Sequence, residues 1–287
     1  MPWRSLDRSH SPARKMSNRA LIVAEIGENH GGDWQLARLM IREAARAGAD
    51  AVKFQSYLGS DVADSDPEKD WFTRVQLPDL IHFELKTYAE QCGVEFLSTP
   101  FSIGRARFLV EELGLRKMKV ASSEMLNFAI LDYLNGRVEL ALLSTGMATE
   151  DEIKVAVAHL DRVPHVCLMQ CTTQYPCPVE QANLSVLPAL KKTFPNCQIG
   201  YSDHTVGIMA ATLARALGAE VIEKHFTTDK TLPGTDHILS ADPAEMAKLV
   251  HDIRTTEVLL GNPEKRPTAA EHAIKEIVRS RFPKDRA

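Results

Sequence analysis

Long apolar runs are missing from this sequence of 287 residues. No window reaches the roughly 18 uncharged apolar residues that a membrane-spanning helix needs. The first residues, MPWRSLDRSHSPARK, lack the apolar stretch that a secretion signal requires. These absences argue against a membrane partner and against export, so the sequence predicts a cytoplasmic protein.

Cysteine is scarce, and its copies do not form a C-x-x-C pair. An odd number of cysteines argues against a disulfide framework, and the spacing argues against a structural zinc site. We therefore expect reduced thiols. The five positions are Cys92, Cys167, Cys171, Cys177 and Cys197.

A basic excess is also missing, because 38 acidic residues outnumber 34 basic ones and give a net charge of -4. Proteins that bind nucleic acid neutralise many phosphates and carry a basic patch for that purpose. The balance of charge therefore predicts no nucleic-acid partner.

Short β-branched runs alternate with amphipathic stretches from residue 20 to residue 261. This rhythm is typical of βα units around a parallel sheet. Eight strands are predicted, at residues 20–27, 51–57, 95–101, 117–124, 140–147, 166–173, 198–205 and 220–227.

The segments between the predicted strands have helical periodicity. In WQLARLMIREAARAGA, Leu39, Met40 and Ala44 share one face, which leaves Arg42 for solvent. Gly48 then ends the helix, because a helix C-terminus favours a residue in the left-handed conformation. Glycine recurs before later strands, at Gly93, Gly114 and Gly218.

Eight βα units in about 240 residues match the usual size of a closed (β/α)8 TIM barrel. An open doubly wound sheet is the alternative. However, no G-x-G-x-x-G follows the first strand, and the glycines of EIGENHGG have the wrong spacing for a dinucleotide loop. We predict an arm at residues 1–17, the catalytic barrel at 18–265, and a C-terminal helix and tail at 266–287.

Polar side chains gather at the carboxyl end of every predicted strand. A single serine or threonine at such a place commonly caps the next helix. Polar residues at the carboxyl ends of all eight strands instead favour an enzyme, because catalytic residues of barrel enzymes collect at this rim. The residues are Glu25, Lys53, Gln55, Thr99, Ser122, Glu124, Ser144, Thr145, Thr172, Thr173, Ser202, His204 and His225.

Two histidines are predicted to lie at neighbouring strand ends. Period-two alternation places Ser202 and His204 on one face of their strand, and Glu223 and His225 on one face of the next. Two imidazoles with carboxylates in reach suit a divalent metal that keeps positions open for water or substrate. The alternative is a hydrogen-bonded pair of histidines, with Asp203 holding a loop.

Lys53 and Lys119 accompany serine hydroxyls at the same rim. Lysine charge and hydroxyl donors suit a small phosphorylated or carboxylated substrate. The alternative for each lysine is a side chain that extends to solvent. Strict alternation would place Lys119 on the face opposite Ser122 and Glu124, so this interpretation needs an irregularity in the strand.

Nine motifs, in order along the chain, resemble the barrel of the N-acetylneuraminate (sialic acid) synthase family over about residues 19–280. Members condense phosphoenolpyruvate with an N-acetylated hexose to give a nine-carbon 2-keto acid and phosphate, and use a divalent metal, commonly Mn²⁺ or Mg²⁺. The motifs are EIGENHGG, AGADAVKFQ, LSTPFS, KVASSE, LLSTGMATEDEI, CTTQYPCP, IGYSDHTVG, GAEVIEKHFT and TDHILS.

The resemblance implies a role for each matching position. The implied metal ligands are His204 and His225, and the implied proton-transfer carboxylates are Glu124 and Glu25. The implied phosphoenolpyruvate contacts are Lys53, Thr99, Lys119, Ser122, Ser144 and Ser202. The implied sugar contacts are Gln55, Tyr175 and Asp236. Asp203 receives no role.

Two departures from the family bear on the acceptor. Members normally continue into a small antifreeze-like domain that covers the active site of the partner subunit, whereas this sequence ends at Ala287. The loop after the second strand is also short. We therefore expect an aldose acceptor that need not be N-acetylmannosamine, in a homo-oligomer or with a separate lid subunit.

Two other functions stay open. A 2-keto acid aldolase or lyase would form a Schiff base on Lys53, Lys119 or Lys224. A catalytically silent barrel would bind a sugar or a partner enzyme, although such a protein has no reason to keep the histidines and lysines together.

Overall fold

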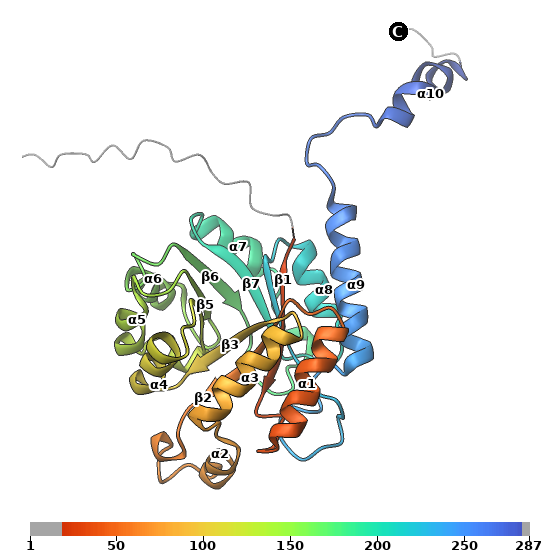
Figure 1. Cartoon of the computed structure of the whole chain (residues 1–287). Helices are drawn as coiled ribbons and strands as arrows, with labels where there is room; N and C mark the ends of the chain where they lie inside the picture. Colours follow the sequence, from red (N-terminus) through yellow and green to blue (C-terminus); the bar gives the residue numbers. More distant parts are fainter. Residues whose placement is uncertain (1–18, 283–287) are drawn as a thin grey trace, which may run out of the picture.

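Eight parallel strands form the centre of the protein, which we describe from a computed structural model over residues 19–282 (Figure 1). The order β3-β2-β1-β8-β7-β6-β5-β4 wraps the sheet around, and β3 and β4 lie next to each other across the remaining seam. The (β/α)8 barrel is confirmed, and the open doubly wound sheet is excluded. The predicted arm at 1–17 lies outside the described residues.

The strands are β1 (Leu21–Gly27), β2 (Ala51–Ser56), β3 (Glu95–Pro100), β4 (Lys117–Val120), β5 (Leu140–Ser144), β6 (His165–Gln170), β7 (Gln198–Asp203) and β8 (Val221–His225). The helices are α1 (Trp34–Arg46), α2 (Lys69–Val75), α3 (Asp79–Gln91), α4 (Ile103–Arg107), α5 (Phe128–Leu134), α6 (Glu150–Ala158), α7 (Val186–Thr193), α8 (Met209–Ala216), α9 (Pro243–Leu260) and α10 (Ala269–Ser280). Shorter turns are the 3-10 helices η1 (Gly59–Asp61), η3 (Ser122–Glu124) and η4 (Val179–Gln181), and the π-helix η2 (Phe108–Glu112).

Helix α1 shows why these segments fold as the periodicity predicts. Its N-cap Asp33 accepts hydrogen bonds from the backbone N–H groups of Gln35 and Leu36, which satisfies two donors of the first turn. Met40 and Ala44 are fully buried against the strands. Gly48 follows the C-cap with φ +89°, a conformation that favours glycine.

Most of the predicted strands end earlier than expected, and the difference is largest for β4. The strand predicted at 117–124 ends at Val120, and η3 follows it, with the Glu124 backbone N–H donating to the carbonyl of Ala121 at 3.0 Å. Adjacent serines favour such turns, because their hydroxyls compete with the backbone for hydrogen bonds. Alternation therefore does not apply to Ser122 and Glu124, and Lys119 lies on the barrel interior without any bulge.

The barrel interior is built in layers. Its lower part is an apolar plug, formed mainly by Val23, Ala51, Leu97, Leu142, Cys167, Met169 and Val221. Gly200 completes the plug because a Cβ there would lie 3.0 Å from the Cys167 sulfur. Two residues further along several strands, charged and hydroxyl side chains replace the apolar ones. The plug therefore supports a polar layer from below.

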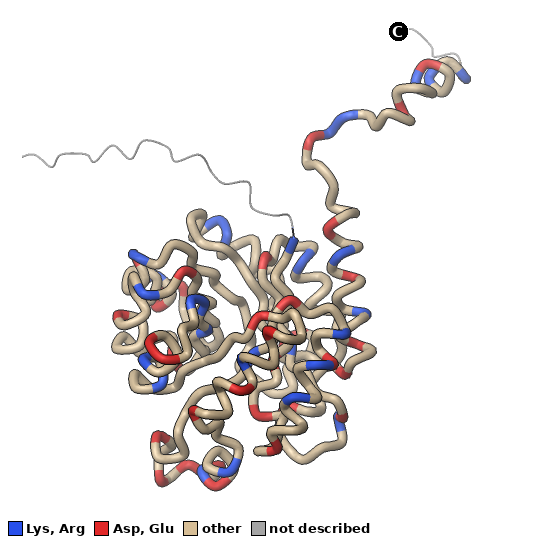
Figure 2. The backbone as a smooth tube through the Cα atoms, viewed as in Figure 1, with Lys and Arg blue, Asp and Glu red and all other residues tan. Residues whose placement is uncertain are grey.

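The larger apolar core lies between the strands and the surrounding helices. Helix α10 is separate from it, because Figure 1 shows this helix standing off from the barrel and none of its residues is buried. Figure 2 shows basic and acidic segments interspersed over the described chain. Across residues 19–282, no helix is both long and apolar enough to cross a bilayer.

Candidate active site

A pocket of about 420 Å³ opens at the carboxyl ends of the strands. Each of the eight strands, or the loop that follows it, contributes to its lining. The pocket brings together all but one of the predicted site residues: Glu25, Lys53, Gln55, Thr99, Lys119, Ser122, Ser144, Tyr175, Ser202, His204, His225 and Asp236.

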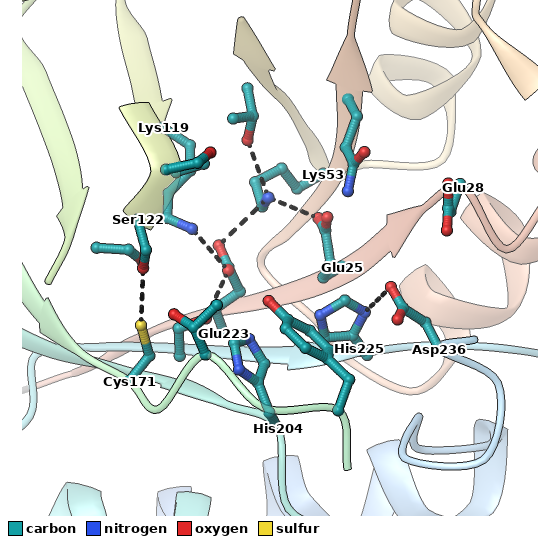
Figure 3. Close-up of a pocket in the computed structure, with 18 of the residues that line it drawn as sticks. Glu25, Glu28, Lys53, Lys119, Ser122, Cys171, His204, Glu223, His225 and Asp236 are labelled. Atoms are coloured by element: carbon teal, nitrogen blue, oxygen red, sulfur yellow. Dashed lines mark hydrogen bonds and ion pairs between the residues drawn. The ribbon is translucent and has the colours of Figure 1, made fainter. Parts of the chain in front are cut away.

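A buried network of charges forms the floor of the pocket (Figure 3). Glu223 Oε1 lies 2.9 Å from Lys119 Nζ and accepts a hydrogen bond of 2.9 Å from Ser202 Oγ. Lys53 Nζ lies 2.9 Å from Glu25 Oε2 and 3.7 Å from Glu223 Oε2. Two lysines and two carboxylates thus alternate at the centre of the barrel.

The network sets the ionisation of its members. Burial raises the pKa of Glu25 despite the nearby Lys53. Burial alone would lower the pKa of Lys53, but Glu223 and Glu25 outweigh it and raise that pKa. The two lysines likewise hold the pKa of Glu223 below its usual range against the effect of burial. Lys53 is therefore a cation at neutral pH.

Hydroxyl groups surround the lysines. Thr99 Oγ1 accepts a hydrogen bond of 3.0 Å from Lys53 Nζ, and Ser122 Oγ accepts one of 3.1 Å from the Gly146 N–H. Ser144 Oγ is buried without a partner among the described residues. A buried hydroxyl without a hydrogen-bond partner costs folding free energy, and a ligand that hydrogen-bonds Ser144 would remove this cost. Cys171 also lies here, with its sulfur 3.1 Å from Ser122 Oγ.

His204 and His225 lie side by side in the pocket, with ring centroids 5.4 Å apart. Nδ1 of His204 lies 2.7 Å from the carbonyl oxygen of Thr172, and Nδ1 of His225 lies 3.2 Å from Asp236 Oδ2. These contacts leave Nε2 of each ring for a ligand, as in metal sites where a carbonyl or carboxylate orients the histidine.

The electrostatics of the two histidines differ. Burial lowers the pKa of His204 to about 3, so this ring is neutral at physiological pH. Burial would also lower the pKa of His225, but Asp236 outweighs it and raises the pKa. Within residues 19–282, no group of three or more His, Cys, Asp and Glu side chains is arranged to hold a metal ion. Two oriented imidazoles fit a metal that takes its other ligands from substrate and water.

Two of the predicted sugar contacts, Tyr175 and Asp236, lie beside the histidines. The Tyr175 ring stacks on His204 with centroids 4.1 Å apart. Asp236 and Gln55 line the same pocket. Figure 3 shows Asp236 across the histidines from Lys119 and Ser122. The pocket thus has a lysine end, where Lys53 and Lys119 pair with Glu25 and Glu223, and an opposite carboxylate end with Asp236.

Glu124 is the predicted site residue that the structure leaves out of the pocket lining. Its Oε2 accepts a hydrogen bond of 2.8 Å from Asn127 Nδ2, at the start of α5. Because η3 is a turn and not a strand, the Glu124 side chain points in another direction than that of Ser122, which lines the pocket.

Three pocket carboxylates were missed as site residues: Glu28, Glu68 and Glu223. Glu223 shares a strand face with His225, so period-two alternation could have identified it. Glu28 lies in the turn after β1, where no periodicity applies, and nothing in the sequence distinguishes it.

Asp203 has a structural role that the sequence left open. Its carboxylate is fully buried, lies 3.1 Å from Lys224 Nζ, and accepts hydrogen bonds from the N–H and hydroxyl of Thr205 at 2.9 and 2.8 Å. Asp203 and Lys224 do not line the pocket. Asp203 therefore holds the loop after β7, which carries His204.

The model of the NeuB family matches residues 40–265. The chain belongs to the NeuB family. An N,N'-diacetyllegionaminic acid synthase of Legionella pneumophila is 37% identical, over 93% of this chain and 80% of that protein. The human N-acetylneuraminate-9-phosphate synthase is 36% identical, over 89% and 75% respectively.

A solved structure agrees with this NeuB assignment. The N-acetylneuraminic acid (sialic acid) synthetase of Leptospira borgpetersenii, in complex with citrate, superposes with a TM-score of 0.86 at 36% identity and covers 92% of each chain. The family predicted from the nine sequence motifs is thus confirmed.

Proposed function

We propose that this NeuB-family protein condenses phosphoenolpyruvate with an aldose, an N-acetylmannosamine-like amino sugar, to give a 2-keto-3-deoxy sugar acid and phosphate. The observation that carries the proposal is the division of the pocket into a lysine end and a carboxylate end, on either side of two histidines. Relatives named as sialic and legionaminic acid synthases support the substrate class.

The lysine end suits the trianionic phosphoenolpyruvate. Lys53 and Lys119 supply charge, while Thr99, Ser122, Ser144 and Ser202 supply hydroxyl donors within the same pocket. The lysines are paired with Glu25 and Glu223, so the charges of these four side chains largely cancel. Binding the anion requires these ion pairs to loosen, which couples substrate binding to the state of Glu25.

We propose His204 and His225 as the ligands of a divalent ion, Mn²⁺ or Mg²⁺. Such an ion, when bound, would polarise the aldehyde of the open-chain acceptor. Tyr175 and Asp236 then orient the acceptor, and Gln55 supplies both a donor and an acceptor of hydrogen bonds.

The reaction forms one C–C bond and one C–O bond to water, and breaks the C–O bond to phosphate. C3 of the enol attacks the aldehyde carbon, and the aldehyde oxygen takes a proton. Water adds at C2 and gives up a proton, and the tetrahedral intermediate then loses phosphate while its C2 hydroxyl becomes the keto group. A carboxylate must take the proton of the water. We propose Glu25 for this role, because it lies in the pocket beside Lys53 and its pKa is raised by burial. Glu124, the other candidate, lies outside the lining.

Ion pairing of the lysines disfavours the Schiff-base alternative. A lysine that forms an imine must lose its proton, whereas carboxylates raise the pKa of Lys53. Lys224 has a lowered pKa because of its burial, but it pairs with Asp203 away from the pocket.

Phosphate release tests the proposed function. The purified protein is incubated with phosphoenolpyruvate, Mn²⁺ and a panel of aldoses that includes N-acetylmannosamine. We expect release that depends on one class of N-acetylated aldose. Release that is the same with and without every aldose would overturn the proposal.

The homo-oligomer and the separate lid subunit stay predictions. Light scattering of the purified protein tests the homo-oligomer.

A further inference from the structure

Glu28 has a buried carboxylate that no part of the proposed reaction uses. It follows β1, lines the pocket and is 8% exposed. Its Oε2 is buried without a hydrogen-bond partner among the described residues. Figure 3 shows Glu28 at the Asp236 side of the pocket, apart from the ion pairs around Lys53.

The turn that carries Glu28 is held in place from several sides. The Gly31 N–H donates to the Glu28 carbonyl at 2.9 Å. Asn29 Nδ2 donates to the carbonyl of Phe226 and to Ser240 Oγ, both at 2.9 Å. Gly32 has φ +85°, and a Cβ there would lie 2.9 Å from the carbonyl oxygen of Arg74. The position of Glu28 is therefore fixed before a ligand arrives.

Among residues 19–282, no lysine or arginine forms an ion pair with Glu28, although His225 acts on it electrostatically. Among the described lining residues, the lysines are Lys53 and Lys119, both in the floor network. The neighbouring carboxylates are Glu68, which is exposed, and Asp236, which pairs with His225. Burial raises the pKa of Glu28 to about 7. The hydrogen bond with the Trp71 side chain lowers this pKa, but by less than burial raises it. The Trp71 side chain hydrogen-bonds the Glu28 carboxyl, but Glu28 Oε2 has no hydrogen-bond partner among residues 19–282, and a ligand can provide one.

We propose that Glu28 is a specificity-determining residue that accepts a hydrogen bond from a hydroxyl or N–H group of the acceptor sugar. The assignment rests on the proposed function and deepens it. A buried carboxylate oxygen without a partner rejects an acceptor that lacks the matching donor, because the oxygen then stays desolvated and unpaired. Glu28 thus selects acceptors that carry a donor at one position.

Steady-state kinetics of Glu28→Ala test this role. At about pH 8.5, above the pKa of Glu28, we expect the KM for the acceptor to rise about 10- to 100-fold, the usual effect of losing a hydrogen bond to a charged group. The KM for phosphoenolpyruvate should stay the same, since the lysine end is intact. Glu84→Ala is the matched control, because Glu84 is an exposed glutamate of α3 outside the pocket lining. The acceptor KM of this variant should change less than about threefold.

Acceptor analogues identify the group that Glu28 contacts. N-acetylmannosamine and analogues that each lack one hydroxyl, or the acetamido group, are compared in the wild type and in Glu28→Ala. One analogue should lose efficiency in the wild type and lose much less in the variant. Glu28→Gln, which keeps an acceptor oxygen and the side-chain shape, should retain part of the discrimination even if Glu28→Ala folds poorly.

The outcomes separate the two proposals. Turnover with an unchanged acceptor KM in Glu28→Ala, or the same penalty for every analogue in both proteins, would overturn the role of Glu28 alone. Absence of phosphate release with every aldose in the wild type would overturn the proposed function, and the role of Glu28 with it.

Discussion

The Glu223 side chain connects the two lysines and a serine at the centre of this barrel. Its carboxylate contacts Lys119 and Ser202 at 2.9 Å and lies 3.7 Å from Lys53 Nζ, although all of these groups are buried. A buried charge is tolerated when partners and hydrogen bonds satisfy it. The lysines that we assign to phosphoenolpyruvate are thus kept in place by Glu223 before the substrate binds.

Replacing Glu223 with Gln should lower the free energy of unfolding by about 3 kcal/mol, because Lys119 would stay buried without its carboxylate. Urea denaturation measures the loss. Glu90→Gln is the control, since Glu90 forms a more exposed pair with Lys86 in α3 and should change stability by less than about 0.5 kcal/mol. Equal effects of the two substitutions would contradict the role of Glu223.

Glu25→Gln and Glu124→Gln separate the two candidate proton acceptors. Glu25 lines the pocket and Glu124 does not, so Glu25→Gln should lower kcat by roughly 10²- to 10⁴-fold, as expected when a general base is removed. Glu124→Gln should keep most of the activity. Stopped-time assays of phosphate release measure both variants, and the reverse ranking would assign the role to Glu124.

His204→Ala should weaken Mn²⁺ binding by more than about 100-fold. Loss of a residue that only supports a metal ligand costs about 10- to 100-fold, and here a ligand itself is removed. Calorimetric titration of the wild type and variant measures the affinity. His251→Ala, an exposed histidine on α9, is the control. Equal Mn²⁺ affinity in all three proteins would contradict the assigned metal site, as would full turnover after the metal is removed with chelator.

At the scale of elements, the sequence predicted where the strands lie but not all of their ends. Alternating βα periodicity placed the eight strands, and β-branched runs gave β1 and β7 within a few residues. The ends of β5, β6, β7 and β8 were placed two or three residues too late. The end of β4 was wrong by more, because a polar run of two serines continues equally well as a strand or as a turn. Whether η3 follows β4 depends on contacts that distant residues make.

The candidate site was predictable where side chains follow strand periodicity. Lys53, Ser202 and His225 lie on strands that point them into the barrel, so residue type and alternation were sufficient. Glu28 was not predictable because it lies in a turn. Its burial depends on segments distant in sequence, such as Phe226 and Ser240, which hold the turn through Asn29.

Helix α10 carries a stripe of exposed apolar residues, including Ile277 at 66% exposure. In the single chain, Ile277→Ala should change the free energy of unfolding by no more than about 0.5 kcal/mol, because surface substitutions have small effects. Ile253→Ala, at a fully buried position of α9, should cost about 2 to 5 kcal/mol. Urea denaturation at several protein concentrations measures both. A large, concentration-dependent effect of Ile277→Ala would instead show that α10 packs on a second copy.

For the whole molecule, function follows from the order of layers along the barrel axis. The apolar plug closes the lower part, the paired charges stand on it, and the histidines with the acceptor end lie above. A Cβ at Gly200 would lie 3.0 Å from the Cys167 sulfur, so glycine at this position lets the plug pack closely below the charges. Under the proposed function, this order of layers would give the anionic substrate the position beside the lysines.

Product analysis tests the central claim of a phosphoenolpyruvate-consuming synthase most directly. The protein, Mn²⁺, phosphoenolpyruvate and the accepted aldose are incubated together, and mass spectrometry and a phosphate assay follow the products. We predict a sugar acid whose mass is that of the aldose plus pyruvic acid, formed in equal amount with phosphate. Borohydride should trap no pyruvate on the protein. A trapped lysine adduct together with a condensation product formed from pyruvate and no phosphate would contradict the account.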